Sequence, residues 1–554
     1  MNRQGAKDAS VRPGGYASAA ALRPAPSLHA ALAWLEGAAP LVLVASIALW
    51  VALVFAASIY KYETFGQGYD QVDFEQAIWN TVQGRPMVDS RFNFSDSIFG
   101  LDWMPMLLLF VPFYAAIPSP HTLFFMQILG AALGAVPLYW LARDRLGSKL
   151  AGLCAALVYL LYPTLLYGVL NPFQVRLFSV TLLLFAIYYF EKGNWKLFAA
   201  AGLLAVLART DVALVVAMFG IYALLRRRRW PWVAAPLAFG LGYFALATFL
   251  IVPSFLHPDA LKGPSGPVTD YMSCWPCGHN PVLAYYGHLG GTFPEIARYI
   301  FTHPVEVLKL MFSSPKVLYI LSLLVPLAFL PLLAPGPLVL GLPILALNLL
   351  STRSAQYDYQ HHYSLLLIPG LMVATVYGAD RLARIAYYVL RRREKLSDAM
   401  RNTQYAIYQA PASYAPYVLL LLAGWAALLN VPYKNPLART LLYHEMPARV
   451  EAARELVAMV PPEAKVAASS FLAPHLLPRR YIYNFPPAPY SPYNFGPERH
   501  SDRFVDLDYI LVDPKASALD ANPIADKSAL EHLRAMPGWV EVASKQNLLL
   551  FKRK

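Results

Sequence analysis

Long apolar stretches separated by short polar ones dominate the hydrophobic pattern of this chain. They fall at about Ala39 to Ile59, 120–142, 149–169, 173–190, 196–208, 211–225, 231–253, 316–334, 336–351, 363–385 and 415–433. About 20 apolar residues suffice for a helix that crosses a bilayer, whereas a signal-peptide core has only about 7–15. The pattern predicts a mainly α-helical polytopic membrane protein with about eleven transmembrane helices, the first of them an uncleaved signal anchor.

One further apolar stretch, from Trp103 to Ile117, is about 15 residues long, which is short for a crossing. Counting it as a crossing would also place the basic residues Arg143 and Arg145 on the outer side. We therefore expect an interfacial or re-entrant helix on the outer face.

From about Asn435 the pattern changes to that of a small α/β domain. It predicts helices at 447–459 and 526–535, strands at 465–468, 481–483 and 509–512, and a closing hairpin of 540–543 with 548–551. The chain is thus expected to divide into a disordered cytoplasmic tail (1–38), a transmembrane domain (39–434) with outer loops 60–119 and 254–315, and an extracytoplasmic α/β domain (435–554).

Composition agrees with a membrane protein, because 57% of the residues are hydrophobic and only 14% are charged. Soluble domains carry roughly 25% charged residues, so a soluble enzyme and intrinsic disorder are excluded for the bulk of the chain. The net charge of +13 does not indicate a nucleic-acid partner, since excess Lys and Arg in membrane proteins gather in cytoplasmic loops.

The basic residues also set the orientation. With the N-terminus inside and one change of side per crossing, every strongly basic loop is cytoplasmic: 143–149, 191–196, 226–229 and 391–395. This predicts a C-terminal domain on the outer side of the membrane. Most of the polar residues with candidate chemistry then lie in outer loops.

The first outer loop holds Asp70 and Asp73, which share a face if residues 69–81 are helical. Such a carboxylate could act as a general base, or the pair could bind a divalent cation (Mg²⁺ or Mn²⁺) together with phosphate oxygens. The alternative is a solvated amphipathic helix packed on the membrane. Arg91 and Asp102 lie in the same loop.

Arg209-Thr210-Asp211 interrupts about thirty apolar residues, and ionisable groups between membrane spans are often functional. The alternative is a tight turn in which Asp211 caps the next helix and Arg209 reaches the interface. Arg176, near the outer end of another span, could contact a lipid phosphate through two hydrogen bonds or simply anchor the helix end.

Two further groups lie in outer loops. His361 and His362 are adjacent, which is not the i, i+4 spacing of a helical metal pair, so they favour a role at the membrane interface over zinc binding. Cys274 and Cys277 are spaced for a local disulfide in an oxidising compartment, with zinc binding beside His279 as the alternative. Cys154 lies within a span and is expected to be buried and inert.

Several segments resemble the domain-of-unknown-function 2079 family of predicted membrane proteins. They are Tyr69-Asp70 with 74–81 and Gly84-Arg85-Pro86, then 137–143, 209–214, His362-Tyr363-Ser364, Ala473-Pro474-His475-Leu476 and 480–483. The resemblance extends over nearly the whole chain after residue 60.

That family looks like the GT-C class of membrane glycosyltransferases, which take a sugar from a polyprenyl-phosphate carrier on the outer face. The resemblance implies an essential acid in the first outer loop and a soluble outer domain. Some positions depart from the family pattern: Glu75 replaces Asp, Asp102 replaces His, 174–176 replace His-Pro-Glu, and Arg209-Thr210 replace Lys-Glu. These changes alter the charge of the site.

The resulting hypothesis is a glycosyltransferase with Asp70, Asp73 and Asp102 as the catalytic acids. Residues that would contact substrate or phosphate are Arg91, Arg176, Arg209, Asp211, His361 and His362. The expected partners are a polyprenyl-phosphate-linked sugar and membrane lipid, and a divalent cation is an optional cofactor. The alternatives are a non-catalytic membrane scaffold and a transporter or lipid-handling protein of the same fold.

Overall fold

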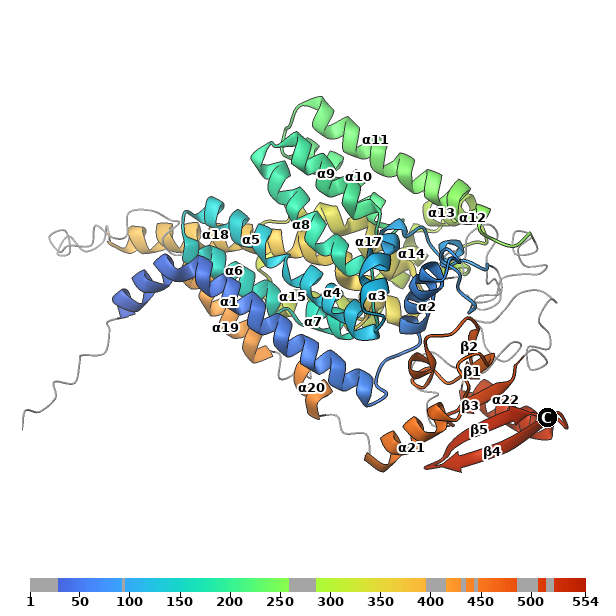
Figure 1. Ribbon diagram of the computed structural model, residues 1–554. Coiled ribbons are helices and arrows are strands. Elements are labelled where there is room, and N and C mark those ends of the chain that lie inside the picture. The colour runs from blue at the N-terminus through green and yellow to red at the C-terminus, as the bar shows by residue number, and fades with distance from the viewer. Residues whose placement is uncertain are drawn as a thin grey trace, which may run out of the picture.

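The computed structural model of the protein describes residues 28–91, 95–258, 285–394, 415–429, 435–442, 447–485, 507–514 and 523–554. Long helices fill most of it, and a small sheet formed by the C-terminal residues packs at one end of them (Figure 1). The predicted combination of a helical membrane part with a small C-terminal α/β part is therefore present.

The helical part begins with one long helix and continues through shorter ones. They are α1 (Leu28–Glu63), α4 (Pro120–Ala132), α5 (Ala135–Leu146), α6 (Lys149–Leu160), α7 (Pro163–Leu170), α8 (Arg176–Lys192), α9 (Trp195–Val206), α10 (Val212–Leu225), α11 (Trp230–Leu246), α12 (Val252–Ser254), α14 (Pro304–Met311), α15 (Ser314–Leu324), α16 (Leu330–Leu333), α17 (Leu342–Leu350), α18 (Ile368–Glu394) and α19 (Ala415–Leu429). Helices α2 (Asp70–Val82), α3 (Val111–Ala116), α13 (Phe293–Thr302) and α20 (Pro436–Leu442) lie in the connecting segments.

Four helices in the described part are long and apolar enough to cross a membrane: Ala33–Glu63, Pro120–Leu146, Trp230–Ser254 and His362–Val389. The number rises to six if two bent pairs, Lys149–Leu160 with Pro163–Leu170 and Pro304–Met311 with Ser314–Leu327, each count as one span. Further apolar helices are shorter. The class of helical membrane protein is confirmed, whereas the number of eleven crossings stays a prediction.

The start of the first helix differs from the predicted tail boundary. Helix α1 begins at Leu28, so residues 28–38 are helical, and only 1–27 of the predicted disordered tail lie outside the described residues. The physical reason is local: the segment from Leu28 to Glu36 is rich in Ala and Leu, which are the strongest helix formers.

The short apolar stretch after Trp103 forms no long helix. It folds as a 3₁₀ turn (Pro105–Phe110) followed directly by α3, and both pack against α2. The segment is short, as expected, and its interfacial or re-entrant placement on the outer face stays a prediction.

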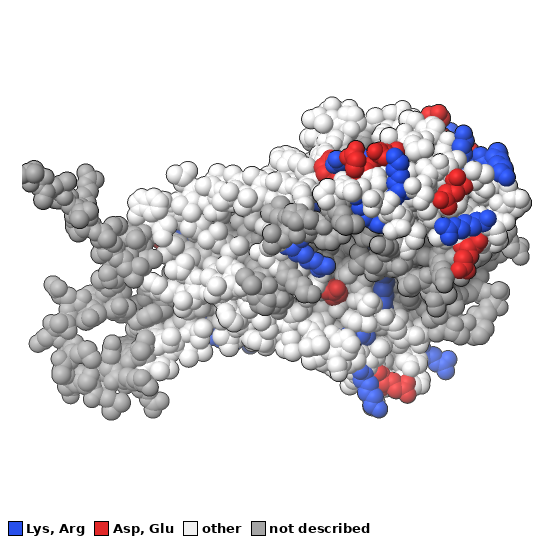
Figure 2. All heavy atoms as spheres, turned by 90° about the horizontal axis from the view of Figure 1, so that it is seen from below, with Lys and Arg blue, Asp and Glu red and all other residues white. Residues whose placement is uncertain are grey.

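The basic loops meet at one end of the bundle. Lys192 Nζ lies 2.6 Å from Asp144 Oδ2, and Glu36 Oε2 accepts hydrogen bonds from the Ser148 hydroxyl and the Leu150 amide, both at 2.8 Å. The sheet lies at the other end of α1. Seen from below, charged side chains gather towards that end, and the long middle of the described surface is nearly uncharged (Figure 2).

The C-terminal sheet has five strands in the order β2-β1-β3-β5-β4. Strands β1 (Val466–Ala468), β2 (Ile482–Asn484) and β3 (Tyr509–Val512) are parallel, with Val466 opposite Ile482 on one side and Tyr509 on the other. β5 (Leu548–Arg553) runs antiparallel to β3 and to β4 (Trp539–Lys545). Helices α21 (Pro447–Ala458) and α22 (Pro523–Ala535) complete the domain.

The sheet shares its hydrophobic core with helix α2. Tyr69 and Val72 are buried in one cluster with Leu456, Leu476 and Ile482. The C-terminal domain therefore packs directly on the segment that carries the first candidate acids.

Candidate functional site

Helix α2 lies between two partners and presents a different face to each. Asp70 and Asp73 lie in the first turn of α2, where their negative charge interacts favourably with the helix dipole. Gly84, at φ +75°, adopts the left-handed conformation that is common just beyond the end of a helix. One face, spaced i, i+3, i+4, i+7, turns towards the sheet and the 85–91 loop: Tyr69, Val72, Asp73 and Gln76. The other face, with the same spacing, meets the helical part: Gln71, Phe74, Glu75 and Ile78.

Arg91 is surrounded by carboxylates. Its Nη1 contacts Asp73 Oδ2 and lies 3.5 Å from Asp70 Oδ1, and its amide donates to Asp89 Oδ1 at 2.9 Å. Burial alone would lower the pKa of Arg91, but Asp73 and Asp70 raise it. Arg91 was predicted to contact a phosphate, and the structure places it with these acids instead.

Asp73 and Asp89 are enclosed in this group. Burial raises the pKa of Asp73 well above its usual range against the effect of Arg91, and raises the pKa of Asp89 to about 6. Asp70 differs, since its side chain is 44% exposed against 4% for Asp73. Of the two predicted acids on α2, Asp70 is thus the one that a substrate can reach.

A second group of charges forms an alternating chain. Arg209 Nε lies 2.7 Å from Asp102 Oδ2 and 3.7 Å from Asp211 Oδ2. Arg176 Nη2 binds the same Asp211 oxygen at 2.6 Å, and Arg176 Nη1 donates to the carbonyl of His362 at 3.3 Å. Burial would lower the pKa of Arg209, but Asp102 and Asp211 raise it, so the guanidinium stays charged.

This chain joins four segments that are distant in sequence. It brings together the predicted residues Asp102, Arg176, Arg209, Asp211 and the backbone of His362. Asp102 is buried and also accepts from the Thr210 amide at 3.3 Å. In this position Asp102 orients the Arg209 turn.

The two groups approach each other at Tyr363. The charges of Asp70 and Arg209 both act on the Tyr363 hydroxyl. The guanidinium groups of Arg176 and Arg353 lie over the Tyr363 ring, 5.6 Å and 5.9 Å from its centre. Tyr363 thus links the accessible Asp70 and the arginine chain electrostatically, which makes them parts of one candidate site.

Arg353, Tyr285 and Tyr363 were not among the predicted site residues. Arg353 Nη1 donates to the Tyr285 hydroxyl at 2.8 Å and lies over that ring. In the sequence, only the nearness of Arg353 and Tyr363 to the two histidines indicated that they could belong to the site. No local pattern marks Tyr285, which reaches the site only through the fold.

Of the other predicted residues, His361 pairs with a neighbouring acid, His362 contacts the arginine chain through its backbone, and two cysteines lie outside the described part. His361 Nδ1 pairs with Asp358 Oδ2 at 3.1 Å, and the His362 contact with Arg176 is made by its backbone. Cys274, Cys277 and His279 lie outside the described residues, so the disulfide stays a prediction. Cys154 is buried and free, as expected.

Glu75 is a buried acid whose carboxylate contacts two neutral side chains. Its carboxylate accepts from the Tyr114 hydroxyl at 2.9 Å and from Gln71 Nε2 at 3.0 Å. Burial raises the pKa of Glu75 to about 7 against both hydrogen bonds. Glu75 thus ties α2 to α3.

Among the described residues, no group of three His, Cys, Asp or Glu side chains is placed to hold an ion, so the divalent cation stays a prediction. The three acids nearest to such an arrangement surround the guanidinium of Arg91 instead.

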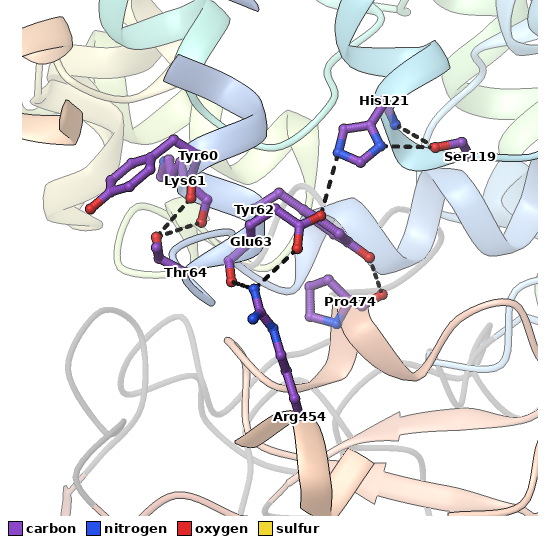
Figure 3. Close-up of polar contacts among 9 residues, drawn as sticks. All are labelled: Tyr60, Lys61, Tyr62, Glu63, Thr64, Ser119, His121, Arg454 and Pro474. Atoms are coloured by element: carbon purple, nitrogen blue, oxygen red, sulfur yellow. Dashed lines mark hydrogen bonds and ion pairs between the residues drawn. The ribbon is translucent and has the colours of Figure 1, made fainter. Parts of the chain in front are cut away.

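The end of α1 anchors the C-terminal domain beside this site (Figure 3). The Tyr62 hydroxyl donates to the Pro474 carbonyl at 3.3 Å, and Arg454 Nη2 lies 3.4 Å from Glu63 Oε2. The His475 ring is stacked on Tyr62 and packs against Phe65, at centre distances of 4.3 Å and 3.8 Å. Burial lowers the pKa of His475 to about 4.

The helical membrane bundle carries an accessible carboxylate and an arginine chain at the end where the small α/β domain packs. The chain belongs to the DUF2079 family of predicted membrane proteins, whose model matches residues 61–550. The resemblance found in the sequence is thereby confirmed. No curated protein matches the chain.

Two solved structures share the fold, both of ArnT from Cupriavidus metallidurans, one bound to undecaprenyl phosphate and one in the apo state. Each has a TM-score of 0.50 and 14% sequence identity, and each comparison covers 92% of this chain and 98% of that one. At this identity the similarity concerns the fold alone.

Proposed function

We propose that this protein is a membrane glycosyltransferase that moves a sugar from a polyprenyl-phosphate carrier to an acceptor on the outer face. One observation carries the proposal: the charges of the accessible Asp70 and of Arg209 both act on Tyr363, and the guanidinium groups of Arg176 and Arg353 lie over the Tyr363 ring. A base next to a cluster of cations suits attack by a hydroxyl and departure of a phosphate. The ArnT fold, seen in one case with undecaprenyl phosphate, supports the choice of carrier.

Asp70 acts as the general base in this proposal. An acceptor hydroxyl does not ionise unaided at neutral pH, so Asp70 takes its proton as the oxygen bonds to the anomeric carbon. The bond between that carbon and the phosphate oxygen breaks, and its electron pair leaves with the carrier phosphate. Arg209 and Arg176 stabilise the negative charge that develops there.

The remaining predicted acids take supporting roles. Asp73 shares Arg91 with Asp70 and keeps that cation in place, while Asp102 orients Arg209. The proposal therefore assigns catalysis to Asp70 alone among Asp70, Asp73 and Asp102.

A non-catalytic scaffold is the second candidate, and one observation favours it. Arg176 and Arg209 are already paired with Asp211 and Asp102, so the chain of charges is complete without a ligand. A scaffold of this kind would hold the C-terminal domain at the membrane surface. It predicts no turnover of a lipid-linked sugar.

We further propose eleven crossings of a bacterial cytoplasmic membrane, with the N-terminus inside and the C-terminal domain outside. Support comes from the basic loops, which meet at the end of the bundle opposite the sheet. Reporter fusions after Asn435 should be active only outside the cytoplasm, and activity inside would overturn the orientation.

The test of function uses the full-length protein in lipid nanodiscs with a panel of undecaprenyl-phosphate-linked pentoses and hexoses. Wild-type protein should release undecaprenyl phosphate, and Asp70→Asn should be slower by roughly 10²–10⁴-fold, the usual contribution of a general base. Asp96→Asn is the matched control, because Asp96 lies in the same loop but its side chain is 88% exposed. No release from any donor, or full activity of Asp70→Asn, would contradict the proposal.

A further inference from the structure

Strand β2 lies at the edge of the C-terminal sheet, and its outer side is completed by a residue from the first loop. β2 pairs with β1 on one side only. The Ser90 hydroxyl donates to the Ile482 carbonyl at 2.7 Å and accepts from the Ile482 amide at 3.0 Å. One side chain thus satisfies both backbone groups that an edge strand otherwise leaves open.

Gln76 of α2 stabilises the contact between Ser90 and Ile482 through further hydrogen bonds. Its Nε2 donates to Ser90 Oγ at 2.9 Å and to the Arg480 carbonyl at 2.8 Å, and its Oε1 accepts from the Ser90 amide at 3.1 Å. A hydroxyl has one donor and two acceptor positions, and Ser90 uses all three. Gln76 is fully buried, so water does not compete for these bonds.

Ser90 is adjacent in sequence to Arg91, which contacts Asp70. Ser90 stands between Asp89 and Arg91, whose amide is bound to the Asp89 carboxylate. The Arg91 guanidinium then reaches Asp73 and Asp70. The path from the sheet edge to Asp70 therefore runs through Ser90 and Arg91.

We infer that Ser90 and Gln76 are positioning residues through which the C-terminal sheet fixes Arg91 and, through it, Asp70. The C-terminal domain then helps to hold the site residues in position. The catalytic meaning of this contact rests on the proposed function, but the positioning itself does not.

The test measures the position of Asp70 directly in full-length protein in nanodiscs. Exposed carboxyl groups are labelled with a water-soluble carbodiimide and glycine ethyl ester, and labelled Asp70 is quantified by mass spectrometry against Asp96 in the same sample. In Ser90→Ala, Asp70 should be labelled roughly three- to tenfold faster, as expected when the contacts of one hydroxyl are lost. Ser90→Thr keeps the hydroxyl and should restore the wild-type rate.

Two further variants separate positioning from general loss of stability. Ser148→Ala removes a hydroxyl that caps α6 at the opposite end of the bundle, and it should leave Asp70 labelling unchanged. Ser90→Cys has a weak hydrogen-bonding group of nearly the same shape, so it should label Asp70 at an intermediate rate, and it serves in place of Ser90→Ala if that variant does not fold.

Catalysis supplies an independent readout. Ser90→Ala should lower kcat for release of undecaprenyl phosphate while the KM for the donor stays the same, and Ser90→Thr should recover kcat. Equal labelling of Asp70 in wild type, Ser90→Ala and Ser90→Cys would overturn the inference. Faster labelling in a protein that transfers no sugar would support the positioning and refute only the proposed function.

Discussion

Arg209 Nε lies 2.7 Å from Asp102 Oδ2, and this ion pair joins the first loop to the turn between α9 and α10. The Asp102 side chain is 7% exposed and that of Arg209 is 19% exposed. A pair so enclosed is costly to break on one side, because the remaining charge has lost its partner in a place that water hardly reaches. Asp102 thus matters for the position of Arg209 whether or not it meets a substrate.

Asp102→Asn should therefore lower the apparent free energy of unfolding by about 3 kcal/mol, and Arg209→Gln should do the same. The double variant leaves no unpaired charge, so it should lose less than the sum by about 1–3 kcal/mol. Denaturant unfolding of the four proteins in detergent completes the cycle. Additive losses would show that the two residues do not stabilise each other.

Glu75 should make stability fall as the pH rises. Burial raises its pKa to about 7, so below pH 4.5 both states hold the proton, whereas between about 4.5 and 7 only the folded state does. In that window the unfolded state binds fewer protons, and stability falls with pH by up to about 3 kcal/mol in total. Glu75→Gln can donate to Tyr114 and accept from Gln71, as the protonated acid can, so it should remove this slope.

The measurement is the melting temperature of wild type and Glu75→Gln between pH 4 and pH 8.5. The two should melt together at the acid end, and Glu75→Gln should be the more stable protein at the alkaline end. A constant difference at every pH would mean that Glu75 does not titrate in this range.

His475 should act in the opposite direction. Burial lowers its pKa to about 4, so between about pH 6.5 and 4 only the unfolded state carries the proton, and stability is lost as the pH falls. The loss approaches about 3 kcal/mol below pH 4 and loosens the junction with Tyr62 and Phe65. Wild-type protein should release C-terminal peptides to an acid-active protease as the pH drops through this range.

His475→Phe keeps an aromatic ring between Tyr62 and Phe65 but does not titrate. Its resistance to the protease should be nearly constant over the same range. Because the Glu75 and His475 windows overlap with opposite signs, each variant is compared with wild type separately. If His475→Phe and wild type lost protease resistance equally as the pH falls, the acid-induced loss of stability would come from groups other than His475.

Local pattern predicted the elements well and the contacts between them poorly. The sequence-predicted strand 509–512 coincides with β3, and the hairpin prediction at 540–543 and 548–551 falls within β4 and β5, because alternation and turn residues are local signals. Asp70 and Asp73 share a helical face and both reach Arg91, as their spacing indicated.

The partners of Asp102 and Ser90 could not be predicted from local sequence patterns. Asp102 meets Arg209, and Ser90 meets Ile482, across about 100 and 390 residues respectively. Nothing in either local segment marks its partner, since the contact exists only once the helices and the sheet have packed. Likewise, the sequence could name Arg176 and Arg209 as candidates but not their alternation with Asp102 and Asp211.

Binding of the carrier phosphate gives the last prediction. If Arg209 stabilises that phosphate, Arg209→Gln should weaken the binding of undecaprenyl phosphate roughly 10- to 100-fold, since hydrogen bonds to charged groups contribute about 1.5–3 kcal/mol each. Undecaprenol, which has no phosphate, should bind both proteins equally. Native mass spectrometry of the protein with graded amounts of each lipid measures the two affinities.

Stability and binding must be separated in this experiment, because Arg209→Gln also leaves Asp102 without its partner. The double variant Asp102→Asn with Arg209→Gln restores charge balance at that pair, yet it should bind undecaprenyl phosphate as weakly as Arg209→Gln alone. Arg226→Gln is the matched control, since Arg226 pairs with Glu191 at 2.8 Å near the basic loops at the opposite end. The role of Arg209 would be refuted if the double variant bound the phosphate lipid like wild type, or if Arg226→Gln weakened it equally.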